Sequence, residues 1–201
     1  MYKFREWISL VDLQVARFAN HLLHKAGNLL TIFLRIFTTL GNNGFIFFVV
    51  MVPLLLFFPT REAGFLIFFA MFYGYILTNI VIKNTLTRPR PFVRVNSEYY
   101  QWWCEAGKLP ESGFSLPSGH TTAAMAFALV MFIFFRKDFS WLFLLIPLLM
   151  AFSRVYFMVH YTSDVITGLI VGAICGILAL ITVYYLKQVT WFIKLLEFKG
   201  I

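Results

Sequence analysis

Five apolar segments alternate with short polar clusters along the 201-residue chain. Runs of about 18 or more apolar residues recur, and such runs are typical of transmembrane helices. The apolar segments are residues 45–58, 64–86, 119–135, 139–158 and 164–186. The pattern predicts an all-α fold, namely a polytopic membrane helical bundle with five clear transmembrane helices.

The N-terminal segment, residues 11–40, is apolar only in part. Its polar side chains include Arg17, His21, His24, Lys25 and Arg35. The segment could be a sixth, tilted span, or it could be an amphipathic helix that lies on the membrane surface. We favour the sixth span, because the sequence Gly41-Asn42-Asn43-Gly44 would make a turn between two crossings.

The last predicted span carries glycine at every fourth position, at Gly168, Gly172 and Gly176. Small residues at this spacing allow two helices to approach closely in a membrane. We therefore expect this stripe to be a helix-packing face, and we assign it no chemistry.

The composition also indicates a membrane protein. Hydrophobic residues make up 60% of the chain and charged residues only 13%, whereas a soluble domain is usually about a quarter charged. The formal net charge is +8. Because the positive residues lie at the ends of the predicted spans and not in one soluble patch, we do not expect nucleic acid as a partner. Residues 1–201 should form a single membrane-embedded domain.

The distribution of lysine and arginine predicts the orientation, since cytoplasmic loops carry an excess of these residues. With six spans, one end of the bundle would carry Lys3, Arg5, Arg61, Arg136, Lys137, Lys187, Lys194 and Lys199. We expect this end to be cytoplasmic. The opposite end is also basic, but we assign its positive residues to a functional site. The prediction is a multi-pass plasma-membrane protein whose site faces the outside.

Three polar clusters lie at the ends of predicted spans, at residues 83–91, 117–120 and 153–164. The first ends an outward-going span, the second begins an inward-going span, and the third contains the turn between the last two spans. All three can therefore meet at one membrane depth. Ionisable groups inside a membrane are energetically unfavourable, so three such clusters at one depth indicate a functional site and not headgroup anchors.

The side chains of these clusters are suited to binding an anion. Lys83, Arg90 and Arg154 supply positive charge and donors that match phosphate oxygens. Ser118 and Gly119 begin a helix, where free backbone N–H groups and the helix dipole favour an anion. Glycine also lets the backbone approach the ligand closely.

Two histidines add catalytic potential to this anion site. His160 and Asp164 are four residues apart, so the carboxylate can bind one ring nitrogen and leave the other as a nucleophile. His120 would then be the general acid. Three cations beside one carboxylate argue against a bound metal, since a two-metal phosphatase needs several Asp or Glu ligands. We expect neither a metal nor another cofactor.

The spacing of these residues resembles the motifs of one known family. Lys83 and Arg90-Pro91 fit a K-x6-RP element, and Pro117 to His120 fit a PSGH element. Ser153, Arg154, His160 and Asp164 fit an SR-x5-H-x3-D element. The chain therefore resembles the integral-membrane members of the type 2 phosphatidic acid phosphatase superfamily. Arg88-Pro89 does not fit, because only Arg90 has the six-residue gap from Lys83.

The resemblance implies a metal-independent phosphoric monoester hydrolase with a helical core of five or six spans. It implies that His160 forms a phosphohistidine, that Asp164 orients it, and that His120 protonates the leaving group. The residues expected to cradle the phosphate are Lys83, Arg90, Ser118, Gly119, His120 and Arg154. In size the chain is similar to short bacterial lipid phosphatases of the phosphatidylglycerophosphatase B and undecaprenyl pyrophosphate phosphatase types, which act at the outer face of the plasma membrane.

The predicted function is hydrolysis of phosphatidylglycerol phosphate, with undecaprenyl pyrophosphate and phosphatidic acid as further substrates. An alternative is an undecaprenyl pyrophosphate phosphatase. An alternative of another class is an anionic lipid transporter, which would use the same cations but would not need the His160–Asp164 pair. The sequence assigns no role to the loop 92–116 and does not indicate an oligomeric state.

Overall fold

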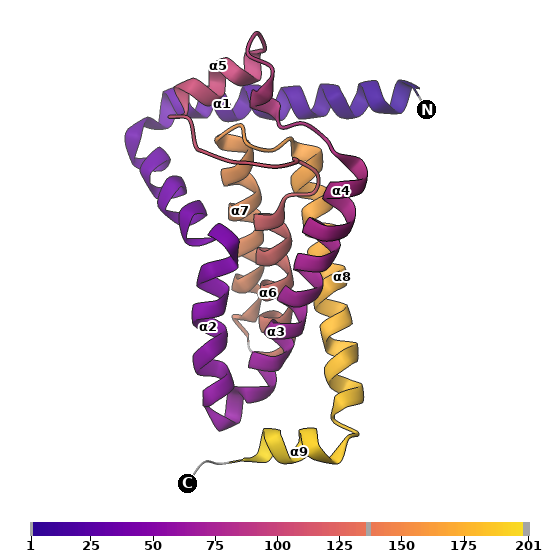
Figure 1. The fold of residues 1–201 in the computed structure, drawn as a ribbon. Helices are drawn as coiled ribbons and strands as arrows, with labels where there is room; N and C mark the ends of the chain where they lie inside the picture. The colour runs from indigo at the N-terminus through magenta and orange to yellow at the C-terminus, as the bar shows by residue number, and fades with distance from the viewer. Residues whose placement is uncertain (1, 136–137, 199–201) are drawn as a thin grey trace.

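The computed structural model describes residues 2–135 and 138–198, and their regular elements are helices with no strand. The helices that run along the long axis of the molecule (Figure 1) are α2 (Phe45–Leu56), α3 (Arg61–Tyr75), α6 (Gly119–Phe135), α7 (Leu145–Tyr156) and α8 (Thr162–Leu186). A π-helical stretch, Ile76–Ile82, extends α3 into α4 (Lys83–Leu86). The predicted all-α fold is confirmed.

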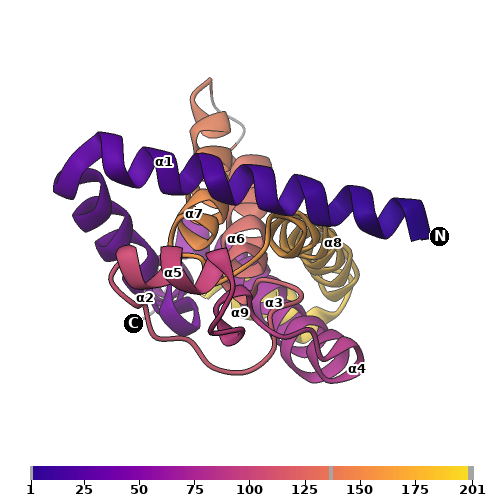
Figure 2. The ribbon, with the colours of Figure 1, turned by 90° about the horizontal axis from the view of Figure 1, so that it is seen from above.

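The first helix, α1 (Tyr2–Leu40), consists of two parts that meet at Gly27. Gly27 has φ 68° and ψ −173°, a conformation that glycine adopts much more readily than other residues. The part before Gly27 lies across one end of the bundle, next to α5 (Glu98–Glu105), and the part after it turns down toward α2 (Figures 1 and 2). Residues 11–40 therefore combine the two alternatives: a helix across the end and a helix along the bundle.

The segment Gly41–Gly44 does not reverse the chain, so the predicted turn between two crossings is wrong. The helical segments Lys3–Leu40 and Asn42–Leu56 meet at a bend of 49°. Asn43 and Gly44 have positive φ angles of 51° and 72°, and these bend the chain locally without turning it back. As a consequence the chain start lies at the end crossed by α1, opposite the start of α3 (Figure 1).

This arrangement corrects the predicted distribution of positive charge. Lys3 and Arg5 belong to the part of α1 that crosses one end, whereas Arg61 lies at the other end (Figure 1). There Arg61 Nη1 donates to the carbonyl oxygens of Leu195 and Phe198 at 2.7 and 2.6 Å, next to α9 (Thr190–Glu197). Arg136, Lys137 and Lys199 lie outside the described residues.

The number of membrane spans is not established by helix length. Within the described residues, Phe58–Leu86 and Thr162–Leu186 are long and apolar enough to cross a bilayer, and the bent pair of α1 and α2 would be a third candidate. Gly119–Phe135 and Ser140–Tyr156 are apolar but shorter. The expected five or six spans therefore remain a prediction.

The glycine stripe of α8 packs against α6, as predicted. A Cβ atom on Gly168 would lie 2.8 Å from the carbonyl oxygen of Ser118, and one on Gly172 would overlap the carbonyl oxygen of Thr122. The two backbones are thus in direct contact. Because α6 and α8 both begin at the end crossed by α1, this contact also fixes the distance between their first residues.

Candidate functional site

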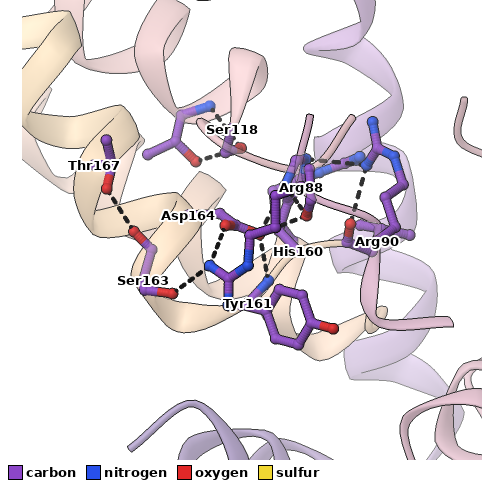
Figure 3. A network of polar contacts seen from close by, with 12 residues as sticks. Arg88, Arg90, Ser118, His160, Tyr161, Ser163, Asp164 and Thr167 are labelled. Carbon is purple, nitrogen blue, oxygen red and sulfur yellow. Dashed lines mark hydrogen bonds and ion pairs between the residues drawn. The ribbon is translucent and has the colours of Figure 1, made fainter. Parts of the chain in front are cut away.

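The three polar clusters meet at the end of the bundle that α1 crosses. Arg90 follows α4, Ser118 precedes α6, and His160 lies in the turn between α7 and α8 (Figure 3). The backbone N–H of Ser118 donates to the carbonyl oxygen of Asp164 at 3.1 Å. Arg90 Nη1 lies 3.1 Å from Nε2 of His160. The structure therefore brings together residues that are up to 76 positions apart, as in the Arg88–Asp164 pair.

His160 is 2% exposed, and its two ring nitrogens face different groups. Nδ1 lies 3.3 Å from the hydroxyl oxygen of Ser115 and 3.6 Å from Oδ2 of Asp164. Nε2 faces Arg90, which has only donors. The neutral ring therefore carries its proton on Nδ1 and its lone pair on Nε2.

The surroundings of His160 keep this ring neutral. Burial lowers the pKa of His160 to about 4; the hydrogen bond with Asp164 acts in the opposite direction, and the positive charge of Arg90 lowers the pKa further. At neutral pH the Nε2 lone pair is therefore available as a nucleophile.

Asp164 is fully buried in the first turn of α8. Its Oδ2 atom accepts hydrogen bonds from the backbone N–H of Tyr161 at 2.9 Å and from the hydroxyl of Ser115. Its Oδ1 atom accepts from Arg88 Nη1 at 2.7 Å. Both oxygens are thus held, with Oδ2 turned toward the His160 ring. Ser115 stands two residues before the PSGH element, but no motif in the sequence marked it as a site residue.

Arg88, which the motif spacing excluded, belongs to this network (Figure 3). Besides Asp164, it donates to Ser163 Oγ at 2.7 Å and, through Nη2, to Oδ2 of Asp12 at 3.0 Å. Asp12 comes from α1 and is 2% exposed. The repeated Arg-Pro-Arg-Pro sequence was a signal for a second functional arginine, whereas nothing around Asp12 marked it in the sequence.

Arg90 is held mainly by loop carbonyls. Its donors reach the carbonyl oxygens of Val159 at 3.0 Å, Gly113 at 3.1 Å and Ser112 at 2.8 Å. Nη2 also lies 3.2 Å from Oε2 of Glu111. These contacts fix the guanidinium beside the His160 ring.

Arg154, at the end of α7, is fully buried. Its Nη1 atom donates to Thr38 Oγ1 at 2.7 Å, and its Nη2 atom donates to Glu111 Oε1. Within the described part of the chain its Nε atom has no hydrogen-bond partner. The carboxylate of Glu111 therefore bridges Arg90 and Arg154, and we call these two arginines the anion cradle.

Glu111 supplies the cradle with an anion from the protein itself. Burial raises the pKa of Glu111, but the charges of Arg154 and Arg90 outweigh burial, and the pKa lies below its ordinary value. The side chain is therefore ionised at neutral pH. No sequence signal marked Glu111, which lies in the loop 92–116.

The other predicted phosphate-binding residues surround the start of α6. The hydroxyl of Ser118, which is buried, accepts hydrogen bonds from the N–H and the hydroxyl of Thr121. Lys83 is half-buried, and its Nζ atom donates to Asn79 at 3.1 Å. A Cβ atom on Gly119 would lie 3.8 Å from Lys83 Nζ. The lysine therefore lies beside the helix start, where it donates a hydrogen bond to Asn79.

His120 lies in the first turn of α6, and its Nε2 atom is 2.9 Å from Oδ1 of Asn42. Asn42 belongs to the Gly-Asn-Asn-Gly segment, which the sequence analysis treated only as a turn. The bend between α1 and α2 therefore brings a polar side chain to the second histidine of the site.

The charged groups that meet at the site are suited to binding an oxyanion. Among residues 2–135 and 138–198, no group of three or more His, Cys, Asp or Glu side chains is placed to hold a metal. The histidine His24 on α1 contacts the carboxylate of Glu105 at 3.2 Å at the protein surface, and within the described residues this pair is not part of such a group. The site offers a ligand guanidinium donors, backbone N–H groups and a neutral imidazole.

Comparison with known proteins gives a family match. The model of a family described as the PAP2 superfamily matches residues 63–188. The undecaprenyl-diphosphatase BcrC of Bacillus subtilis (strain 168) is 32% identical over 104 residues, which are 51% of this chain and 49% of that protein. The lipid A 4'-phosphatase of Porphyromonas gingivalis is 29% identical over 126 residues, which are 59% of this chain and 51% of that protein. The chain spans about half the length of these curated relatives.

A solved structure shows the same fold. The crystal structure of the first transmembrane PAP2 type phosphatidylglycerolphosphate phosphatase from Bacillus subtilis aligns with a TM-score of 0.69. The alignment covers 90% of this chain and 89% of that chain, at 21% sequence identity. At this identity the similarity concerns the fold alone.

Proposed function

Because the chain belongs to the PAP2 superfamily, we propose that it is a membrane lipid phosphatase that works through a phosphohistidine at His160. One observation carries the proposal. Arg90 contacts both Nε2 of His160 and the carboxylate of Glu111, at 3.1 and 3.2 Å. The nucleophilic nitrogen therefore borders the position where the protein already holds an oxyanion.

In the first step, the lone pair on His160 Nε2 attacks the phosphorus atom, and the bond from phosphorus to the leaving oxygen breaks. His120 gives its proton to that oxygen. Nδ1–H donates to the hydroxyl oxygen of Ser115, which in turn donates to Asp164. The carboxylate, 3.6 Å from Nδ1, stabilises the positive charge that forms on the ring. Arg90 and Arg154 bind the phosphoryl oxygens with fork-shaped donors.

In the second step, a water molecule attacks the phosphorus of the phosphohistidine. Its proton goes to His120, the bond from phosphorus to Nε2 breaks, and the ring returns to its neutral form as inorganic phosphate leaves. Lys83 and the backbone N–H of Gly119 complete the charge stabilisation at the start of α6, whereas the N–H of Ser118 is bound to the carbonyl oxygen of Asp164. The protein's own donors supply the charge stabilisation that a metal supplies in other phosphatases.

The substrate class is a lipid phosphate, since the site lies at one end of an apolar helical bundle. We propose phosphatidylglycerol phosphate as the main substrate, by resemblance to bacterial lipid phosphatases of the phosphatidylglycerophosphatase B type. Undecaprenyl pyrophosphate is the second candidate, and the relative named undecaprenyl-diphosphatase favours it. The relative named lipid A 4'-phosphatase adds lipid A phosphate as a third class to test.

The arrangement of the helices supports a proposal for the membrane topology. We propose that the part of α1 after Gly27 and α2 form one span, and that α3 with α4, α6, α7 and α8 form the others. The part of α1 before Gly27 would then lie on the membrane surface instead of making a sixth span. Arg61 and Lys187 would be cytoplasmic, and the site would face the outside of a plasma membrane.

Phosphate release by the purified full-length protein in detergent tests this function. The panel contains phosphatidylglycerol phosphate, undecaprenyl pyrophosphate, phosphatidic acid and lipid A phosphate, each with excess chelator. We expect release from at least one lipid, unchanged by the chelator and inhibited by vanadate. Release that requires added magnesium would overturn the metal-independent mechanism, and binding of the lipids without any release would favour the anionic lipid transporter.

A further inference from the structure

Arg88 joins two buried carboxylates that come from different parts of the chain. Its Nη1 atom donates to Oδ1 of Asp164 at 2.7 Å, and its Nη2 atom donates to Oδ2 of Asp12 at 3.0 Å. The side chains of Asp12 and Asp164 are 3% and 0% exposed, whereas that of Arg88 is 27% exposed. The arginine therefore lies at the edge of the site with its charge directed inward.

The two oxygens of Asp164 have different partners. Oδ2 accepts from Tyr161 N–H and from Ser115, and it faces Nδ1 of His160 at 3.6 Å. Oδ1 accepts from Arg88. A rotation of the carboxylate about its Cβ–Cγ bond would move Oδ2 away from the His160 ring, and the hydrogen bond to Arg88 opposes this rotation.

Arg88 is itself fixed from several sides. Its guanidinium carbon lies 4.0 Å from the centroid of the Tyr161 ring, a cation–π contact. Asp12 accepts from Arg88 and also from the backbone N–H and hydroxyl of Ser163, at 2.7 and 2.8 Å. Asp12 thereby links the surface-lying part of α1 both to the arginine and to the first turn of α8.

The contacts of Arg88 separate it from the anion cradle. Its partners are Asp12, Ser163, Asp164 and the Tyr161 ring, whereas Arg90 and Arg154 share the carboxylate of Glu111. An arginine that neutralises two buried carboxylates is not free to bind a phosphoryl group. A buried carboxylate that loses its charged partner is strongly destabilised, so the chain of three charges acts as a unit.

We propose that Arg88 and Asp12 are positioning residues, which hold the carboxylate of Asp164 in the orientation that His160 needs as nucleophile. This inference rests on the proposed phosphatase function. Arg88 acts through Asp164 on the reaction rate, and Asp12 acts through Arg88. Neither residue contributes to binding of the phosphate.

Steady-state kinetics of the full-length protein in detergent test the inference, with the best lipid phosphate of the panel as substrate. Arg88→Gln should lower kcat by about 10- to 100-fold, the size of effect that a small misplacement of a catalytic group produces. KM and the inhibition constant of vanadate should stay within about threefold, which would be less than 1 kcal/mol. Arg90→Gln should instead weaken vanadate inhibition. Arg17→Gln is the matched control, because Arg17 forms an exposed ion pair with Glu98 at the same end, and it should change neither value.

A second set of variants shows whether Arg88 acts through Asp164. In an Asp164→Asn background, adding Arg88→Gln should cause no further fall in kcat, because the group on which it acts is already altered. Arg88→Lys, which keeps the charge but cannot bind both carboxylates equally well, should retain more activity than Arg88→Gln. Asp12→Asn should lower kcat in the same direction as Arg88→Gln but by a smaller factor.

Each contrary result has a definite meaning. An unchanged kcat in Arg88→Gln, or a loss of rate that adds fully to that of Asp164→Asn, would overturn the inference. A rise in the vanadate constant equal to that of Arg90→Gln would make Arg88 a phosphate ligand instead. If Arg88→Gln does not fold, Arg88→Lys and Asp12→Asn carry the same test. A wild-type protein that releases no phosphate from any lipid would contradict the proposed function. This result concerns the wild type alone and can be distinguished from every result on the Arg88 and Asp12 variants.

Discussion

Glu111 lies between Arg90 and Arg154, so that an acidic side chain from the loop 92–116 occupies the most positive part of the site. A carboxylate is planar and a phosphoryl group is tetrahedral, but both present negative oxygens that can bind the same guanidinium donors. They cannot occupy the cradle together. If Arg90 and Arg154 bind the phosphoryl group, as proposed, Glu111 must leave the two arginines when the substrate binds.

The first prediction concerns this competition. Glu111→Gln keeps the size of the side chain but removes its charge, so vanadate should inhibit the variant more strongly, by about tenfold, which corresponds to 1.4 kcal/mol. The measurement is the vanadate inhibition constant of the purified protein. Glu105→Gln is the control, because Glu105 pairs with His24 at the surface of the same end. Weaker inhibition of Glu111→Gln would mean that the carboxylate organises the arginines instead of competing with the anion.

The second prediction concerns Arg154, which reaches Thr38 with one terminal nitrogen and Glu111 with the other. A lysine has a single terminal nitrogen and cannot replace this fork. Arg154→Lys should therefore weaken transition-state stabilisation by about 2 kcal/mol or more, as seen in kcat/KM, whereas Arg17→Lys at the surface should not. Nearly normal turnover of a folded Arg154→Lys protein would show that Arg154 does not bind the transferred phosphoryl group.

The third prediction follows from the pKa of His160, which burial lowers to about 4 from an ordinary value of 6.5. Between these two pH values the unfolded chain binds more protons at this residue than the folded protein does, so acidification favours unfolding. The melting temperature of the wild type should therefore fall relative to that of His160→Gln as the pH is lowered from 6.5 to 4. Melting temperatures of the two proteins that change in parallel over this range would contradict the lowered pKa.

The fourth prediction separates the two histidines with nitrophenyl phosphate, whose leaving group needs no proton. His120→Ala should be nearly inactive on the lipid substrate, because a general acid typically contributes about 10²–10⁴-fold. It should still release a burst of roughly one nitrophenolate per enzyme, and the protein should then hold acid-labile phosphate. His160→Ala should give no burst, since the nucleophile is absent.

Two outcomes would change the assignment of the histidines. If both folded variants release no nitrophenolate, the division of roles between His120 and His160 has no support. If His160→Ala alone gives the burst, His120 is the nucleophile. Detection of the burst by absorbance, together with the pH stability of the bound phosphate, distinguishes these cases.

The fifth prediction concerns the side of the membrane on which the site lies. Single cysteines at residues 97–112, in a background without Cys104 and Cys175, should react with a membrane-impermeant thiol reagent on intact cells. The two native cysteines are free thiols, so both must be replaced. Labelling that appears only after lysis would place the site on the cytoplasmic side.

The sequence predicted the meeting of the three polar clusters because span ends and motif spacings are local properties. The side chains that support them were not predictable in this way. Ser115, Asp12 and Glu111 contact Asp164, Arg88 and Arg154, which are 49, 76 and 43 positions away in the chain. No periodicity or motif spacing in the sequence predicts contacts over such separations. The K-x6-RP spacing selects Arg90, and Arg88 was therefore given no role. A match at one arginine does not, however, exclude a role for a second.

The Gly-Asn-Asn-Gly segment shows a different limit. Asparagine and glycine are residue types that adopt positive φ angles, and Asn43 and Gly44 do so here. Turn-forming residues specify local backbone angles, however, and two such angles can produce either a reversal or a shallow bend. The packing of α1 and α2 against the bundle decides between these outcomes, and this packing also gives Asn42 its contact with His120.

The contact between Gly168 and the carbonyl of Ser118 has a consequence for how this protein can be inactivated. A single methyl group at this position would separate α6 from α8, and it would move Ser118, Gly119 and His120 at the start of α6 away from His160 and Asp164 at the start of α8. No charge would change and no ligand-contacting side chain would be lost. A search for inactive variants should therefore find Gly168→Ala and Gly172→Ala beside the charged residues, and their defect should be one of alignment, with the protein still inserted in the membrane.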